Sequence, residues 1–146
     1  MTIEDNRNLI QQYFSVITGV DTSTELSEFF TEDVTWHLPQ SNPMIKPNPR
    51  VGLDAVMDIL TSGVNVYQAG SLKIRQPLLV ADTDHVTAQF TLDAKLANGK
   101  DYSNQYVMLF SILEGKINRV WEHLDTLYQW QLGTFDGHCD EAVTQA

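Results

Sequence analysis

The chain has 146 residues, of which 42% are apolar, and its 19 acidic and 9 basic side chains give a net charge of −10. That length and apolar content predict one globular domain with a single core. Nucleic acids are bound through basic side chains that neutralise phosphates, so this balance excludes such a partner. No stretch approaches the roughly 20 apolar residues of a membrane span.

Three helices are expected in the first half of the chain. Apolar residues at helical spacing predict the first over residues 5–18, with Asp5 as its cap. A Thr-x-x-Glu capping pattern predicts a second over 22–30, and an apolar stripe after Gly52 predicts a third over 52–62. Between the last two, a short strand leads into residues 39–49, which hold four of the five prolines and therefore form a loop that could cover a site.

The second half of the chain is expected to form long strands. Strands are predicted over residues 71–80, where Pro77 favours a sheet edge or a bulge, and then over 86–94 and 102–113. The last two are joined by an Asn98-Gly99 hairpin turn. A Glu-Gly turn leads to a final strand over 116–125, with a short helix or coil after it.

This order predicts an α+β fold, because the helices come first and the strands follow as an antiparallel meander. We expect one domain over residues 1–133, followed by a polar tail over 134–146 that contains the single cysteine, Cys139. One cysteine forms no internal disulfide, and the N-terminal sequence lacks the pattern of a signal peptide. These features together predict a cytoplasmic protein.

The final strand carries the strongest functional signal. Alternate residues of a strand share a face, which puts Arg119, Trp121, His123 and Asp125 on one side. Polar groups of this kind are buried only where they have partners or line a cavity. We therefore interpret this face as the wall of a small-molecule pocket, with the alternative that His123 and Asp125 form a structural pair at its rim.

Four segments, LIQQYFSVITGVD, FFTEDVTWHLP, NPRVGLDAV and EGKINRVWEHLDT, occur in an order and spacing that resemble the SnoaL-like polyketide cyclase branch of the nuclear transport factor two-like superfamily. The resemblance covers residues 5–132. It implies a cone-shaped domain in which a curved, mostly antiparallel sheet wraps around three N-terminal helices and encloses a hydrophobic pocket. It also implies a homodimer, which we expect to form through a second sheet face carrying Val107, Leu109 and Val120.

Individual positions resemble those of two enzymes of the superfamily. The first helix resembles that of ketosteroid isomerase, which matches Tyr13 to its oxyanion-hole tyrosine, although the two acids of that enzyme have no counterpart here. The last strand resembles that of limonene epoxide hydrolase. There Asp125 matches a catalytic aspartate and His37 matches the asparagine that positions water. The other aspartate of that enzyme matches Asp93 only if the 96–99 hairpin is shorter here, and its arginine then falls on Thr91.

These observations predict a cofactor-independent acid/base enzyme of the isomerase, cyclase or dehydratase type, acting on a small apolar substrate with a carbonyl or hydroxyl group. Asp125, His123 and His37 are the candidate proton carriers, and Tyr13 is the candidate oxyanion donor. The predicted pocket wall consists of Trp36, Trp121, Tyr106, Met108 and Phe110. No ligand spacing typical of a metal site occurs. A non-catalytic binding module and an epoxide hydrolase are the alternatives.

Overall fold

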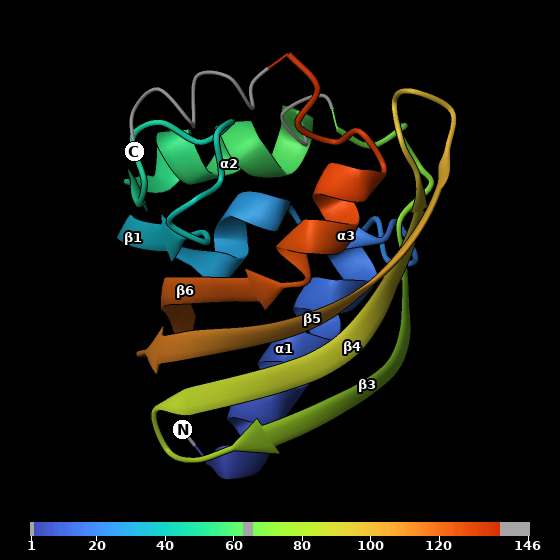
Figure 1. Cartoon of the computed structure of the whole chain (residues 1–146). Coiled ribbons are helices and arrows are strands. Elements are labelled where there is room, and N and C mark those ends of the chain that lie inside the picture. The colour runs from blue at the N-terminus through green and yellow to red at the C-terminus, as the bar shows by residue number, and fades with distance from the viewer. Residues whose placement is uncertain (1, 63–65, 138–146) are drawn as a thin grey trace.

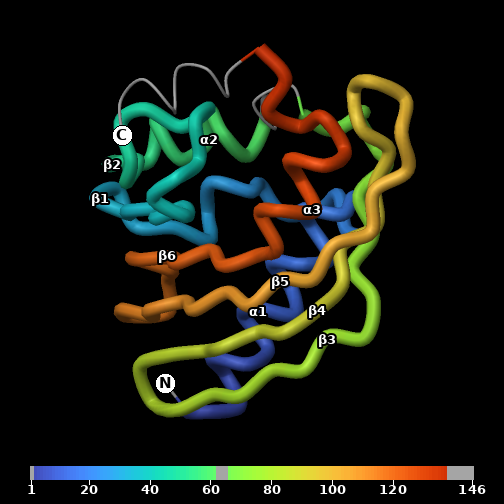
Figure 2. Tube along the Cα trace, in the orientation of Figure 1, coloured from blue at the N-terminus to red at the C-terminus, as the bar shows by residue number. Residues whose placement is uncertain are grey.

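A computed structural model describes residues 2–62 and 66–137, and it has the predicted α+β architecture. Six strands form one sheet in the order β2-β1-β6-β5-β4-β3. The pairs are antiparallel except for β1 with β6, which is parallel. The long strands curve around α1, as Figure 1 shows, and the Cα trace in Figure 2 follows the same bend. The sheet is therefore strongly curved and remains open.

The helical segments agree with the sequence in two of three places. Helix α1 spans Ile3–Ile17, and its cap is Thr2, which forms a capping box with Asp5. Helix α2 spans Leu53–Ser62. The predicted helix over 22–30 is instead the four-residue 3₁₀ turn η1, Leu26–Phe29, and Glu25, the N-cap residue before it, makes no side-chain capping hydrogen bond. A further short helix, α3, covers Thr126–Gln131.

The strands lie close to their predicted positions. Their bounds are β1 Phe30–His37, β2 Arg50–Val51, β3 Lys73–Ala81, β4 His85–Lys95, β5 Asp101–Leu113 and β6 Lys116–Leu124. Pro77 lies on β3, an edge strand of the sheet, within the register shift between Arg75 and Leu78. It thus removes no ladder hydrogen bond from the sheet interior.

The core fills the concave side of the sheet. Tyr13 of α1 packs edge-on against Phe29, Phe30 and Phe110, with ring centroids 5.7–5.9 Å apart. Such edge-to-face contacts add to the stability that the burial of these large rings already provides. Farther along the sheet Phe90 stacks on Tyr106 at 5.4 Å. Aromatic side chains on the concave face of the sheet thus form the layer against which the helices pack.

Two residues beyond position 133, where the domain is predicted to end, pack against the rest of the structure. Thr134 and Phe135 line the interior cavity, and Phe135 is 7% exposed. The packed part of the chain therefore continues past residue 133. Residues 138–146, and with them Cys139, lie outside the described residues.

Candidate functional site

A cavity of about 160 Å³ lies between the concave face of the sheet and the helices. Helices α1 and α2, the β1–β2 loop, the inner faces of five strands and the α3 region contribute to its wall. Most lining residues are apolar, among them Ile59, Leu72, Ile74 and Leu92. A dry apolar cavity of this size accommodates a molecule such as benzene, so the space suits a small ligand.

The proline-rich loop after β1 forms part of the cavity wall through Asn42, Met44 and Ile45. The amide of Asn48 holds this loop, because its Nδ2 donates to the carbonyl oxygens of Leu38 and Pro39 at 3.1 and 3.2 Å. The Asn48 Oδ1 in turn accepts from the Leu38 N–H at 3.1 Å. The loop is thus tied to the end of β1, where it covers the cavity.

Strand β6 contributes Glu122 and Leu124 to the cavity wall. Glu122 lies opposite Met108 of β5. Its side chain keeps some accessible surface because it faces the cavity, but the surrounding protein shields its carboxyl from bulk water. This burial raises the pKa of Glu122 to about 7, and no charge or hydrogen bond from another described residue counteracts it. Glu122 is therefore ready to exchange a proton near neutral pH.

Three tyrosine side chains line the same cavity as this carboxyl group. Burial, and then the charge of Glu122, raise the pKa of Tyr13 far above the usual tyrosine value. Burial raises the pKa of Tyr67 and Tyr106 well above that value too, and Glu122 adds to the effect. Tyr13, Tyr67 and Tyr106 all line the cavity, so each presents a neutral hydroxyl group rather than a phenolate.

Four of the residues proposed from the sequence lie at this cavity: Tyr13, Trp36, Tyr106 and Met108. Two others do not line it. Phe110 is fully buried in the aromatic core beside Tyr13 and Phe14. Trp121 lies on the opposite, outer face of the sheet, where its ring stacks on His37 at a centroid distance of 5.0 Å.

The three proposed proton carriers also lie away from the cavity wall. His37 is half-buried beside Trp121, and its Nε2 lies 3.1 Å from the Thr35 hydroxyl. Burial, and then the charge of Arg119, lower the pKa of His37. His123 is exposed on β6 opposite Val107. The structure therefore does not bring the two histidines into the cavity, and their catalytic role stays a prediction.

Asp125 has a structural partner at the end of β6. It is the N-terminal cap of α3, where its Oδ1 accepts from the Tyr128 N–H at 3.0 Å. Its side chain is exposed. The catalytic role predicted for it is therefore not supported by contact with the cavity, and the observed contact accounts for an aspartate at this position.

A bulge in β6 explains why the face that lines the pocket is not the face predicted from the sequence. Ser111 pairs with Arg119 and Ile112 with Ile117, so Asn118 is an extra residue in β6. Such a bulge interrupts the alternation of faces. After it, Val120, Glu122 and Leu124 face inward. The signal that could have identified Glu122 is its two-residue spacing from apolar Val120 and Leu124.

Metal-site geometry is also absent from what the structure describes: within residues 2–62 and 66–137, no group of three or more His, Cys, Asp or Glu side chains could hold an ion. In the same ranges, no helix is long and apolar enough to cross a membrane.

Several solved structures of other proteins share this architecture. No curated protein sequence matches the chain. A polyketide cyclase from Xanthomonas campestris, provisionally so named, superimposes with a TM-score of 0.74 at 20% identity, covering 92% of this chain and 99% of its own. A provisionally named isomerase from Bacillus subtilis gives 0.72 at 18% identity, with 90% and 94% covered. TerC, crystallised with polyporic acid, gives 0.73 at 18%, with 88% and 97% covered.

These structural likenesses establish the NTF2-like fold, which an NTF2-like protein from Burkholderia xenovorans also has. The sequence itself gives the family. The model of the SnoaL-like domain matches residues 10–120, which is well over half of the chain, and it ends within β6, two residues before Glu122. The chain belongs to the SnoaL-like domain family.

Proposed function

We propose that this protein is a cofactor-independent acid/base enzyme that moves a proton within a small, largely apolar carbonyl compound. The observation that carries the proposal is Glu122, a carboxyl group in an apolar cavity with a pKa of about 7. A general acid or base is most effective when its pKa lies near the working pH. Polyketide cyclase and isomerase names among the structural neighbours support the same class of function.

The proposed reaction is an isomerisation through an enol or enolate. The Glu122 carboxylate takes a proton from the carbon next to the substrate carbonyl, and the electron pair of the broken C–H bond moves toward the carbonyl oxygen. The carboxylic acid so formed then returns the proton to another carbon of the conjugated system. At neutral pH both forms of Glu122 are populated, so each half of the reaction starts from an available state.

Tyr13 is the proposed donor to the oxygen that becomes negative. Its ring is fixed in the aromatic core, and it lines the cavity. Its hydroxyl makes no hydrogen bond to another residue in the described ranges 2–62 and 66–137. A hydrogen-bond donor already fixed at the site of developing charge stabilises the transition state without reorganisation.

The cavity restricts the substrate by size and polarity. A volume of about 160 Å³ with an apolar wall fits one ring or a short branched chain. TerC, which shares the fold, was crystallised with polyporic acid. This supports a cyclic ligand for the present cavity as well.

Proton exchange tests the proposal without knowledge of the natural substrate. Small ketones such as acetophenone derivatives with an α-methyl group would be incubated in D₂O, and the loss of the α-proton signal followed by NMR. We expect the protein to accelerate exchange and Glu122→Gln to reduce the rate by about 10²–10⁴, the usual contribution of a general base. Exchange that is equally fast in folded Glu122→Gln protein would contradict the proposal.

Two alternatives make different forecasts in the same experiment. A binding module would bind the ketones with no acceleration of exchange in the wild-type protein. An epoxide hydrolase of the kind that the sequence resembles needs a second acid close to the first, whereas Glu122 is the one carboxylate among the described cavity-lining residues. Acid/base catalysis by a single carboxyl group is therefore the better fit to this cavity.

A further inference from the structure

Beside Glu122, the cavity wall contains polar atoms that the proposed proton transfer does not use. The hydroxyl groups of Tyr67 and Tyr106 lie 2.9 Å apart, and those of Tyr102 and Tyr106 lie 2.8 Å apart. Tyr67 and Tyr106 line the cavity, whereas Tyr102 is fully buried behind them. These residues form a chain of three hydroxyl groups that begins in the core and ends at the cavity.

The direction of this chain follows from Asn104. Its Nδ2 donates to the carbonyl oxygen of Asp125 at 3.1 Å, and its Oδ1 accepts from the Gln105 N–H at 2.8 Å. A carbonyl oxygen only accepts and a backbone N–H only donates, so the orientation of the Asn104 amide is fixed. Its Nδ2 must then also be the donor in the 2.8 Å contact with the Tyr102 hydroxyl.

Counting protons leaves a free donor. Three hydroxyl groups carry three protons, and the two contacts between them use two. Tyr102 accepts from Asn104, and the acceptor that the described residues offer to its own buried proton is the Tyr106 hydroxyl, so the unused proton lies on the cavity side, at Tyr67 or Tyr106. Hydrogen bonds in such a chain polarise one another, which strengthens the final donor.

An unused acceptor lies in the same wall. Gln129 of α3 is 6% exposed and lines the cavity, and its Oε1 has no hydrogen-bond partner among the described residues. The Gln129 side chain interacts with the Tyr102 hydroxyl, although its Oε1 makes no hydrogen bond there. The Tyr102 ring centroid lies 5.5 Å from that of Tyr67. Leaving a buried polar atom without a partner is costly, which points to a ligand group that fills this role.

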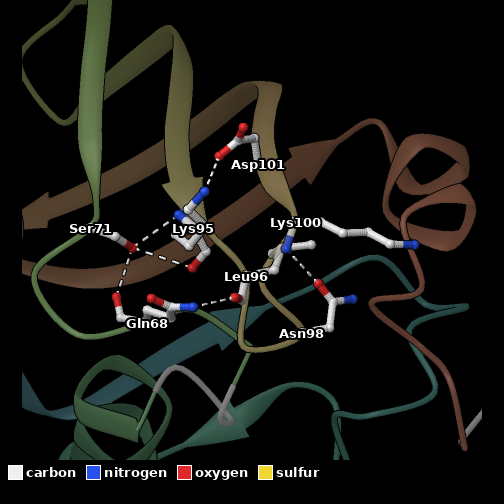
Figure 3. Close-up of polar contacts among 7 residues, drawn as sticks. All are labelled: Gln68, Ser71, Lys95, Leu96, Asn98, Lys100 and Asp101. Carbon is white, nitrogen blue, oxygen red and sulfur yellow. Dashed lines mark hydrogen bonds and ion pairs between the residues drawn. The ribbon is translucent and has the colours of Figure 1, made fainter.

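Both sides of this wall are anchored to the β4–β5 hairpin. Figure 3 shows Ser71 and Gln68 held against the hairpin, with Ser71 Oγ at 3.1 Å from the Lys95 N–H and Gln68 Nε2 at 3.0 Å from the Leu96 carbonyl oxygen. This fixes the segment that carries Tyr67. On the other side, Asn98 Nδ2 donates to the Leu132 carbonyl oxygen at 3.1 Å, just after α3.

We propose that Tyr67, Tyr106 and Gln129 form a subsite for a hydroxyl group of the ligand, so that the substrate is a carbonyl compound with a second, hydroxyl function. A hydroxyl group both accepts and donates, and it therefore matches the free donor and the free acceptor together. A methyl group would satisfy neither, and an ether or carbonyl oxygen would leave Gln129 without a partner. The subsite deepens the proposed function and rests on it for the position of the reacting carbonyl group at Glu122.

The test compares ligands of similar shape by calorimetric titration: 4-hydroxyacetophenone, 4-methylacetophenone and 4-methoxyacetophenone. We expect the wild-type protein to bind the hydroxy compound about 10- to 100-fold more tightly than the other two, because each of those leaves buried polar groups unpaired. The apolar methyl compound would be favoured if burial alone decided affinity. Equal or weaker binding of the hydroxy compound would overturn the proposal and show that the subsite holds water only.

Two variants test which residue causes the preference for the hydroxy compound. Gln129→Met keeps the approximate size but removes the acceptor, so the preference for the hydroxy compound should fall about tenfold. Glu122→Gln should keep the preference, because Glu122 contacts the carbonyl part common to all three ligands. An unchanged preference in folded Gln129→Met protein would overturn the subsite. If that variant does not fold, the wild-type ratio decides. Since binding is measured without turnover, loss of the subsite and loss of acid/base activity remain distinguishable.

Discussion

The two faces of β6 place neighbouring ionisable residues in opposite environments. Glu122 points into the cavity, and burial raises its pKa to about 7. His123, the next residue, is exposed on the outer face. Beside it on that face, His37 stacks on Trp121 rather than facing the cavity. The comparison teaches that the environment of a residue, more than its type, determines whether it can act as an acid or a base.

The largest expected effect compares these two neighbours directly. In the D₂O exchange measurement, Glu122→Gln should reduce the rate at least about 100-fold, whereas His123→Gln should change it less than about threefold. Both substitutions replace an ionisable side chain with the same amide, so they form a matched pair. A larger loss from His123→Gln would reverse the assignment of the two faces.

The next effect is on stability and its pH dependence. A raised carboxyl pKa means that the native state holds the proton of Glu122 more tightly than the unfolded chain, so the free energy of unfolding falls as the pH rises from about 4.5 to about 7. The Glu122→Gln protein has no carboxyl group at this position, so its free energy of unfolding does not fall in this way. It should therefore exceed the wild-type stability by up to about 3 kcal/mol at pH 8, with little difference at pH 4. Urea unfolding at several pH values measures this, and parallel curves for the two proteins would count against the buried carboxyl.

A smaller effect is expected at Asp125. Asp125→Ala removes the side-chain cap of α3 and should lower the free energy of unfolding by about 1 kcal/mol. Asp125→Asn keeps a capping oxygen and serves as the control, with little loss. Exchange activity per folded molecule should stay within about threefold in both. A loss of activity in stable Asp125→Asn protein would instead support the catalytic role predicted from the sequence.

The smallest expected effect on activity comes from disrupting a homodimer that forms through the outer face of the sheet. We propose a homodimer there, since Val107 is 40% exposed on a long strand and Leu109 lies on the same side. Val120, expected on that face, is instead fully buried in the core. Sedimentation should give about twice the 16.5 kDa chain mass. Val107→Lys should give the monomer with unchanged exchange activity, and a wild-type monomer at micromolar concentration would refute the dimer.

Local sequence patterns determined most of the fold. The 3.6-residue period located α1 and α2, alternation located the long strands, and the Asn98-Gly99 turn located their hairpin. Such signals act between residues close in the chain, so they can be recognised without the tertiary structure. They failed at residues 22–30, where a capping pattern precedes a single 3₁₀ turn, because caps stabilise a helix but packing decides whether it continues.

Only the tertiary structure decided which face of β6 encloses the cavity. On either side of the extra residue Asn118, buried Ile117 and buried Val120 both face inward, so a simple alternation cannot be extended through the strand. The sequence by itself determined that the strand carries functional residue types and that Tyr13 lies on the core side of α1. The choice of Glu122 over Asp125, and the meeting of Tyr67 with Tyr106 and Gln129, depend on contacts between segments distant in the chain. Those contacts exist only once the sheet has curved around the helices.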